Sequence, residues 1–236
     1  MSVGSIKENI SSEKRVAITP ETAKNIISLG LNISLEKNYA EHLGIRDKQY
    51  EEVGVKLFNS SSEVISNSKL ILKVNCPTDE EIKILKEKTI LIGIFNPTRN
   101  ENKLKEILKK NINIFSLELL PRISRAQSMD VLSSQSNLAG YRAVIESIYE
   151  FEKAIPMMMT AAGTVPAAKV LVIGAGVAGL QAIATAKRLG AIVSATDVRA
   201  TSKEQVESLG GTFLMVEQEE NLETAGGYAQ EASEEF

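Results

Sequence analysis

A glycine-rich turn carries the most specific chemistry in the sequence. Gly174, Gly176 and Gly179 have the GxGxxG spacing, and they directly follow the β-branched run Lys169–Ile173. A helical segment and a second apolar run come next, with Asp197 about 20 residues beyond the glycines. The spacing alone is weak evidence, but strand, glycines, helix, second strand and acid together predict a dinucleotide-binding unit.

Each glycine has a distinct physical task in such a unit. Gly174 permits the tight turn, Gly176 lets the backbone approach a pyrophosphate, and Gly179 allows the helix to pack closely on the strand. The unpaired N–H groups and dipole of the helix N-terminus then favour the phosphates. We therefore expect the cofactor NAD(H) to contact the whole turn, namely Gly174, Ala175, Gly176, Val177, Ala178 and Gly179.

The residues after the second strand bear on which dinucleotide is bound. Asp197 can accept hydrogen bonds from a ribose diol, and its charge would repel a 2′-phosphate, which favours NAD over NADP. Arg199 argues mildly the other way, because an arginine can pair with a phosphate. We expect Asp197, Val198 and Arg199 to line the ribose end of the site. The alternative is that Asp197 only caps the following turn.

Composition narrows the class of protein. The 236 residues include 27 basic and 30 acidic side chains, and a net charge of -3 gives no reason to expect a nucleic-acid partner. Cys76 has no second cysteine to pair with, and we interpret it as a small buried side chain. His42, the only histidine, is interpreted as a surface residue, and no metal site is expected. No apolar stretch reaches the roughly 20 residues that span a bilayer, so we expect a soluble polypeptide that meets a membrane only through partners.

Alternating apolar runs and amphipathic segments predict the elements that position these residues. In the first half, Thr19, Pro20 and Gly30 delimit a helix over Thr22–Leu29. The strands expected there are Val3–Ile6, Leu31–Leu35, Lys69–Val74, Thr89–Ile94 and Ile112–Ser116.

The second half begins after a polar loop at residues 117–132. A 3.6-residue period predicts a long helix from Ser133 to Ala154, followed by a small-residue connection at 156–166. Strands are expected at 170–173, 191–196 and 212–216, about half of the six that a Rossmann domain needs. The predicted fold is α/β with two Rossmann-like parallel-sheet domains: 1–132, a connecting helix and linker at 133–166, and an incomplete NAD-binding domain at 167–236.

Several segments together resemble one family. They are Arg15–Glu21, Pro121–Asn137, Gly140–Gly211 and Glu223–Ala229. The chain resembles the NAD(H)-binding alpha subunit, or domain I, of proton-translocating NAD(P) transhydrogenase, which is related to alanine dehydrogenase. The resemblance implies hydride transfer between NAD(H) bound here and NADP(H) bound on a partner domain, coupled to proton translocation.

The resemblance also implies roles for two loops. Arg122, Gln127, Asp130 and Ser133 would position the nicotinamide and its ribose, without acting as acid or base. The alternative is a structural loop with a surface ion pair. Gly227 and Tyr228 would belong to a mobile loop that folds over the nucleotide. The implied partners are membrane-embedded and NADP(H)-binding subunits and a second copy in a homodimer, with the chain on the cytoplasmic side of the inner membrane.

Two other functions remain open from the sequence. Alanine dehydrogenases resemble this chain in Arg15 and Lys73, which they use on the substrate, but they place a catalytic histidine where this chain has Asn96. An amide cannot shuttle the proton that amino-acid oxidation requires. We expect Arg15 to pair with a carboxylate and Lys73 to be a strand-end charge at the cleft. The third function is a non-catalytic NAD-binding module, because the second domain is short.

Overall fold

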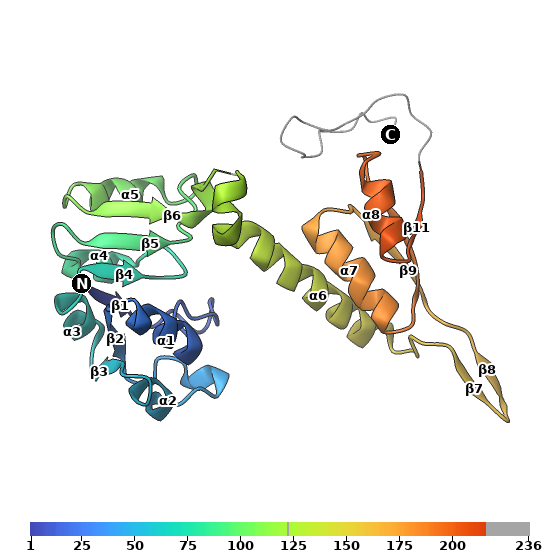
Figure 1. The fold of residues 1–236 in the computed structure, drawn as a ribbon, viewed down its shortest axis with the longest axis horizontal. Helices are drawn as coiled ribbons and strands as arrows, with labels where there is room; N and C mark the ends of the chain where they lie inside the picture. The colour runs from blue at the N-terminus through green and yellow to red at the C-terminus, as the bar shows by residue number, and fades with distance from the viewer. Residues whose placement is uncertain (122, 216–236) are drawn as a thin grey trace. The chain divides into compact units, whose positions relative to one another are not determined.

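The computed structural model describes residues 1–121 and 123–215 (Figure 1). The chain forms two compact units that divide between Asp130 and Val131. Each unit is built on its own parallel sheet, so the α/β class predicted from the sequence is confirmed. No helix in the described part of the chain is both long and apolar enough to cross a membrane.

The first unit contains a six-stranded parallel sheet in the order β3-β2-β1-β4-β5-β6. Its strands are β1 (Ser2–Ser5), β2 (Asn32–Glu36), β3 (Lys56–Phe58), β4 (Leu70–Leu72), β5 (Ile90–Gly93) and β6 (Asn113–Ser116). Its α-helices are α1 (Pro20–Ser28), α2 (Asp47–Glu51), α3 (Ser61–Ser66), α4 (Asp79–Ile84) and α5 (Glu101–Leu108). The remaining elements are short 3-10 turns, η1 (Glu41–Leu43), η2 (Leu117–Leu119) and η3 (Ser124–Met129).

Helix α1 shows how local sequence sets an element boundary. The Thr19 hydroxyl accepts a hydrogen bond from the Thr22 N–H, and Pro20 is the first helical residue. Gly30, with φ of 79°, follows the end of the helix in the left-handed region that side chains disfavour. The five strands expected in this half are all present with small shifts in their ends. The three-residue strand β3 was not predicted.

The second unit contains a three-stranded parallel sheet in the order β11-β10-β9. Its strands are β9 (Lys169–Ile173), β10 (Ile192–Thr196) and β11 (Thr212–Phe213), and its helices are α6 (Val131–Phe151), α7 (Val177–Arg188) and α8 (Ser202–Ser208). Helix α6 was predicted to start at Ser133. It ends at Phe151, ahead of the predicted Ala154, because Glu152 adopts a positive φ of 52°.

Helices α6 and α7 pack at unusually close range. A β-carbon added to Gly140 of α6 would overlap the backbone carbonyl oxygen of Ala178 in α7. Ala182, Ile183 and Ala186 of α7 are buried in the core of this unit. Small residues on both helices therefore let α6 support the first turn of α7.

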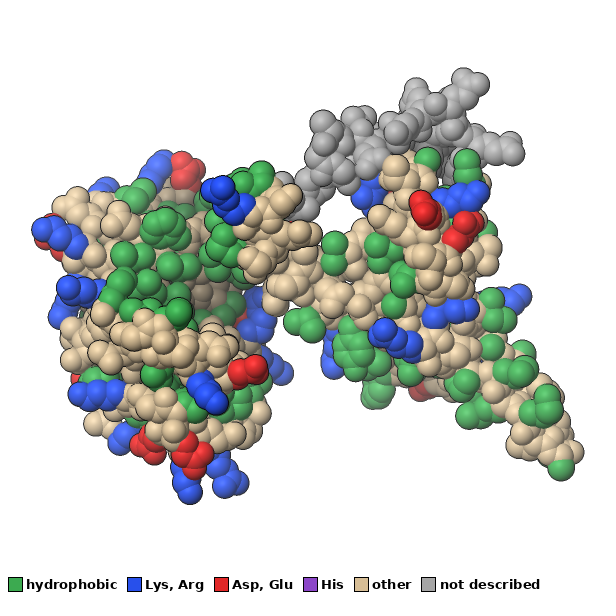
Figure 2. Space-filling model, in the orientation of Figure 1, with side chains coloured by type: hydrophobic (Ala, Val, Ile, Leu, Met, Phe, Trp, Pro, Cys, Tyr) green, Lys and Arg blue, Asp and Glu red, His purple; other side chains and the backbone are tan. Residues whose placement is uncertain are grey.

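The connection predicted at 156–166 is instead a β-hairpin. Met158–Thr160 (β7) pairs in antiparallel fashion with Gly163–Val165 (β8). Gly163 has φ of 141°, which allows the chain to reverse. Its apolar side chains face solvent, with Met159 73% exposed, and green side chains follow this hairpin in Figure 2.

Candidate functional site

The glycine-rich turn joins β9 to α7 at the carboxyl end of the second sheet. Gly174 has φ of 94°, and its N–H donates to the Thr196 carbonyl of β10 over 2.8 Å. A side chain at this φ would be strained, so the chain leaves the strand through a conformation that favours glycine. The turn geometry expected of Gly174 is confirmed.

The other two glycines meet different surroundings. A β-carbon on Gly179 would overlap the Gly174 carbonyl oxygen and lie 3.5 Å from Val172 of β9. Gly179 therefore brings α7 against the strand, as expected. A β-carbon on Gly176 would meet only the Arg199 guanidinium, at 3.9 Å. Among residues 1–121 and 123–215, no other atom lies within 4 Å of that position, so this part of the chain leaves the space over Gly176 open to a ligand.

The start of α7 has the form of an anion site. Gly176 is the N-cap residue in extended conformation, and no side chain caps the helix there. Ala175 is fully buried, whereas Val177 is 44% exposed beside Ala178 at the start of the helix. The exposed N-terminal turn leaves backbone N–H groups available to phosphate oxygens.

Asp197 connects the ends of β9 and β10. Its carboxylate accepts hydrogen bonds from the Ala175 N–H at 2.6 Å and from the Arg199 N–H at 2.9 Å. The Arg199 side chain adds contacts of 2.8 Å from Nε and 3.0 Å from Nη2. Val198, between them, is partly buried. Asp197 therefore caps the turn after β10 through the Arg199 N–H. Through the Ala175 N–H it also contacts the residue next to Gly176.

The ionisation of Asp197 reflects two opposing effects. Burial raises its pKa, but hydrogen bonds from the Arg199 side chain and from the Arg199 and Ala175 N–H groups outweigh burial. The net result is a pKa below the ordinary value of 3.8. Asp197 is an anion at neutral pH, and its negative charge is paired with the positive charge of the Arg199 guanidinium.

The residues expected around the nicotinamide fall in both units. Gln127 lies in η3 with an exposed side chain, and Asp130 follows that turn. Ser133 is in the first turn of α6, in the unit that carries the glycine turn. Arg122 lies outside the described residues, as do Gly227 and Tyr228.

The first unit has a buried charge cluster at the carboxyl end of its sheet. Lys73 follows β4 with its side chain only 3% exposed, and its Nζ lies 2.9 Å from Glu81 and 3.5 Å from Glu8. Burial raises the pKa of Glu8, although the Lys73 charge opposes that shift. Arg15 pairs with Glu13 at 2.7 Å, as expected of a structural arginine. Lys73 is a strand-end charge, but it is enclosed by two carboxylates.

Three further residues considered from the sequence, Asn96, His42 and Cys76, also lie in the first unit. Asn96 adopts a positive φ of 47°, and its backbone N–H donates to the Glu118 carboxylate. His42 is exposed, and its Nε2 lies 2.8 Å from the Lys14 carbonyl. Cys76 is only partly buried, and burial raises the pKa of its thiol.

Gly140 was not singled out from the sequence. Its lack of a side chain lets α6 approach the Ala178 carbonyl of α7, the helix that follows the glycine turn. A glycine in the middle of a long helix was the available signal, because glycine is otherwise unfavourable there. Its partner is distant in sequence, so the contact itself could not be read from local pattern.

Comparison with known proteins identifies the family. Residues 4–139 match the alanine dehydrogenase/PNT N-terminal domain, and residues 143–232 match the corresponding C-terminal domain. The chain is 49% identical over 193 residues to a Rickettsia prowazekii protein that is the first portion of NAD(P) transhydrogenase subunit alpha, covering 80% of this chain and 50% of that protein. With the Rhodospirillum rubrum protein of the same name, identity is 49% over 194 residues, with the same coverage.

Solved structures agree with these matches. A transhydrogenase from Sinorhizobium meliloti superposes with a TM-score of 0.87 at 49% identity, covering 91% of this chain and 64% of that one. An L-alanine dehydrogenase with 20% identity shares the fold, with a TM-score of 0.78 over 90% of this chain and 60% of that one. The chain spans about half the length of the curated relatives it matches. It belongs to the alanine dehydrogenase/PNT family.

Proposed function

We propose that this chain binds NAD(H) at the Gly174–Gly179 turn and acts within an NAD(P) transhydrogenase alpha subunit. One observation carries the proposal: the uncapped start of α7, open over Gly176, occurs in a chain 45–49% identical to such subunits. In this proposal the reaction is hydride transfer between NAD(H) held here and NADP(H) held by a partner.

The pyrophosphate would lie over Gly176, against the N–H groups of Val177 and Ala178. Absence of a side chain at Gly176 removes the atoms that would block this approach, and the dipole of the 12-residue helix α7 favours the negative charge. Gly179 supports this arrangement by letting α7 pack against β9, and Gly140 does so by letting α6 pack against α7.

The adenosine ribose would lie at Asp197, whose carboxylate is already oriented by the Ala175 N–H. Because the Arg199 guanidinium is held by Asp197 through two side-chain contacts, it has less capacity to pair with a 2′-phosphate. We therefore assign this end of the site to NAD(H) in preference to NADP(H).

The nicotinamide end would be held by Arg122, Gln127, Asp130 and Ser133, with Gly227 and Tyr228 closing over the nucleotide. Hydride transfer moves a hydrogen with its electron pair from C4 of the reduced nicotinamide to C4 of the oxidised one. This step needs aligned, close rings and no protein acid or base. These side chains would orient the ring rather than exchange protons.

The transhydrogenase proposal extends to partners. An NADP(H)-binding subunit would receive the hydride, and a membrane-embedded subunit would couple transfer to proton movement, holding this chain at the cytoplasmic side of the inner membrane. A homodimer is also proposed, for which the exposed apolar hairpin Met158–Val165 offers surface.

The test is a titration followed by a transfer assay. The 236-residue chain is titrated with NADH and NADPH by calorimetry, then mixed with the NADP(H)-binding subunit of a relative, and hydride transfer is followed between NADH and an NADP⁺ analogue. We expect NADH to bind more tightly than NADPH and transfer to require the partner. Absence of NADH binding, or oxidation of alanine to pyruvate by the chain alone, would contradict the proposal.

A further inference from the structure

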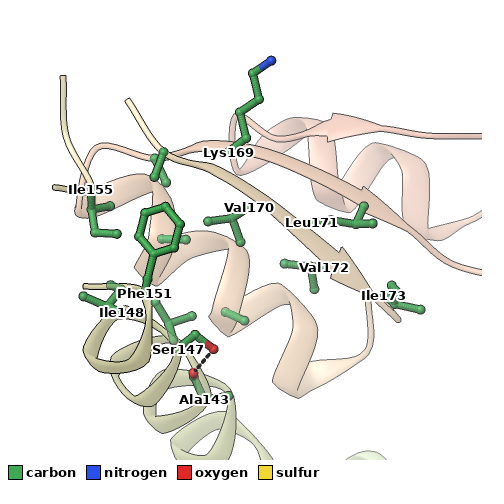
Figure 3. Close-up of a pocket in the computed structure, with 15 residues that line it drawn as sticks. Ala143, Ser147, Ile148, Phe151, Ile155, Lys169, Val170, Leu171, Val172 and Ile173 are labelled. Carbon is green, nitrogen blue, oxygen red and sulfur yellow. Dashed lines mark hydrogen bonds between the residues drawn. The ribbon is translucent and has the colours of Figure 1, made fainter. Parts of the chain in front are cut away.

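The second unit has an apolar groove and, separately, a charged edge. The groove lies between α6 and β9, has a volume of about 420 Å³ and is lined mostly by apolar side chains (Figure 3). Among its described lining residues, Lys169 points its ammonium away from the others, and the Ser147 hydroxyl donates to the Ala143 carbonyl of its own helix. The charged pair Asp197–Arg199 lies instead at the carboxyl end of the sheet, beside the glycine turn.

The Arg199 side chain covers the Asp197 carboxylate. Asp197 Oδ1 accepts hydrogen bonds from the Arg199 backbone N–H at 2.9 Å and from its Nε at 2.8 Å. Oδ2 accepts from the Ala175 N–H at 2.6 Å and from Arg199 Nη2 at 3.0 Å. These donors occupy the roughly four lone-pair sites of a carboxylate, and the Asp197 side chain is only 5% exposed. In this arrangement of the described residues, a ribose hydroxyl cannot reach the acid.

Two of the donors to Asp197 are fixed by the backbone. The N–H of Ala175 follows Gly174, whose own N–H is held by the Thr196 carbonyl at 2.8 Å. The backbone N–H of Arg199 lies in a turn that the Ser202 N–H closes on the Arg199 carbonyl at 3.1 Å. The guanidinium donors differ, because rotation about side-chain bonds moves them without disturbing either strand. The Arg199 side chain is therefore the part of this cluster that a ligand can displace.

A ribose diol carries the donors that can replace the guanidinium. An acid at this position of a dinucleotide site accepts hydrogen bonds from ribose hydroxyls. The 2′- and 3′-hydroxyls would take the places of Nε and Nη2, so Asp197 would keep its full set of donors through the exchange. A 2′-phosphate replaces one of these hydroxyls and adds a negative charge that the carboxylate repels. The exchange therefore suits an unmodified diol.

The displaced guanidinium has an anion close by in the proposed complex. Beyond the chain neighbours, Arg199 Nη2 is the nearest described atom to a β-carbon placed on Gly176, at 3.9 Å. The pyrophosphate is proposed to lie in that space, and a guanidinium pairs well with phosphate oxygens. The positive charge of Arg199 can thus pass from the carboxylate to a phosphate over a short distance.

We propose that the Arg199 side chain is a displaceable cover of Asp197. In the free chain the guanidinium occupies the acceptor sites of the carboxylate. When NAD(H) binds, the ribose diol takes those sites and the guanidinium moves to a pyrophosphate oxygen. This inference rests on the proposed NAD(H) site and makes Arg199 a specificity-determining residue, because the cover is released in exchange for two hydroxyls.

Adenosine tests the cover, because it carries the diol and no phosphate. Its affinity for the 236-residue chain and for Arg199→Ala is measured by ligand-observed NMR titration. Arg199→Ala leaves the carboxylate uncovered, so it should bind adenosine about fivefold more tightly, since the ligand no longer has to open a mostly closed state. 2′,3′-Dideoxyadenosine lacks both hydroxyls and should bind parent and variant equally. Equal adenosine affinities, or the same gain with the dideoxy compound, would overturn the proposal.

NADH tests the transfer of the guanidinium to the pyrophosphate. Loss of a charged partner for the phosphate offsets the gain from uncovering the acid, so Arg199→Ala should bind NADH no more tightly than the parent. A gain for NADH equal to that for adenosine would overturn the exchange. Arg188→Ala is the matched control, because it removes the same charge from an exposed position in the last turn of α7. It should keep both parental affinities.

The parent chain alone supplies a direct measurement. Its Arg199 Nε–H donates to Asp197 at 2.8 Å, so the proton should exchange slowly with solvent in the free chain. Adenosine should speed that exchange, whereas 2′,3′-dideoxyadenosine should not. An Nε–H signal that saturating adenosine leaves unchanged would overturn the cover, whether or not Arg199→Ala folds.

The two proposals fail in different ways. A parent chain that does not bind NADH would overturn the proposed NAD(H) site and the cover with it. A parent chain that binds NADH, but whose Arg199→Ala variant shows no gain for adenosine, would overturn the cover alone.

Discussion

The Asp197 carboxylate accepts a hydrogen bond from the Ala175 N–H at 2.6 Å, across the carboxyl ends of two adjacent parallel strands. This contact connects the acid at the end of β10 to the middle of the glycine turn after β9. A residue proposed to select the cofactor therefore also holds the turn that would bind the pyrophosphate. Substitutions of Asp197 should affect both tasks, and suitable variants can separate them.

Asp197→Ala removes both the negative charge and the acceptor for Ala175. We expect it to weaken NADH binding severalfold and to reduce the preference for NADH over NADPH, because repulsion of a 2′-phosphate is lost. Asp197→Asn is the matched variant, since it retains an acceptor while removing the charge. It should reduce the preference with less effect on thermal stability. The assignment would be contradicted if Asp197→Ala and the parent gave the same titration curve with NADH and also the same titration curve with NADPH.

Gly176 and Gly179 should respond differently to the same substitution. Gly179→Ala overlaps a backbone carbonyl, which should cost roughly 1–3 kcal/mol in the free energy of unfolding. Within the described part of the chain, the methyl group of Gly176→Ala meets only the Arg199 guanidinium, at 3.9 Å, and the variant should leave stability nearly unchanged. Both variants should bind NADH more weakly, Gly176→Ala because its methyl group occupies the phosphate approach. Urea unfolding and calorimetry measure the two effects, and wild-type NADH affinity in Gly176→Ala would be the contrary result.

The buried pair Glu8–Lys73 predicts a pH dependence of stability. The pKa of Glu8 in the folded state is raised above 4.5, chiefly by burial, so the folded chain binds this proton more readily than the unfolded chain. The contribution of Glu8 to stability should therefore fall as pH rises from about the unfolded value through the raised folded one. Glu8→Gln should remove that portion of the slope, while Lys73 keeps its 2.9 Å contact with Glu81.

Urea unfolding between about pH 4 and pH 8 measures this effect, because the range spans the titration of a carboxyl group with a raised pKa. Glu36→Gln is a control carboxylate on the same sheet, whose long 3.8 Å contact with Lys7 is more exposed. The prediction fails if Glu8→Gln and the parent have parallel stability profiles.

Local pattern was sufficient to predict the β9–turn–α7–β10 unit. The Gly174 turn, the helix and the next strand follow one another directly, and each has its own sequence signal. The hairpin at Met158–Val165 was missed because its strands have only three residues each and follow a proline. Short strands lack the length over which a period can be recognised.

Tertiary contacts account for what the sequence could not predict. Lys73 was expected as a strand-end charge, but its burial depends on Glu8 and Glu81, which lie on other segments of the first unit. The contact between Gly140 and Ala178 likewise joins two helices. Lys73 was singled out from the sequence and Gly140 was not, and in both cases only the packing of separate elements shows what the residue contacts.

Gln127 provides a test of the proposed nicotinamide loop. Its side chain is exposed in η3, so Gln127→Ala should leave thermal unfolding unchanged. If the amide positions the nicotinamide or its ribose, the variant should transfer hydride to an NADP⁺ analogue on the partner subunit about 10- to 100-fold more slowly, because ring alignment sets the rate. Single-turnover absorbance measures that rate. Ser128→Ala, an adjacent exposed side chain with no proposed role, should transfer at the parental rate. Similar rates for the two variants would instead assign the loop a structural role.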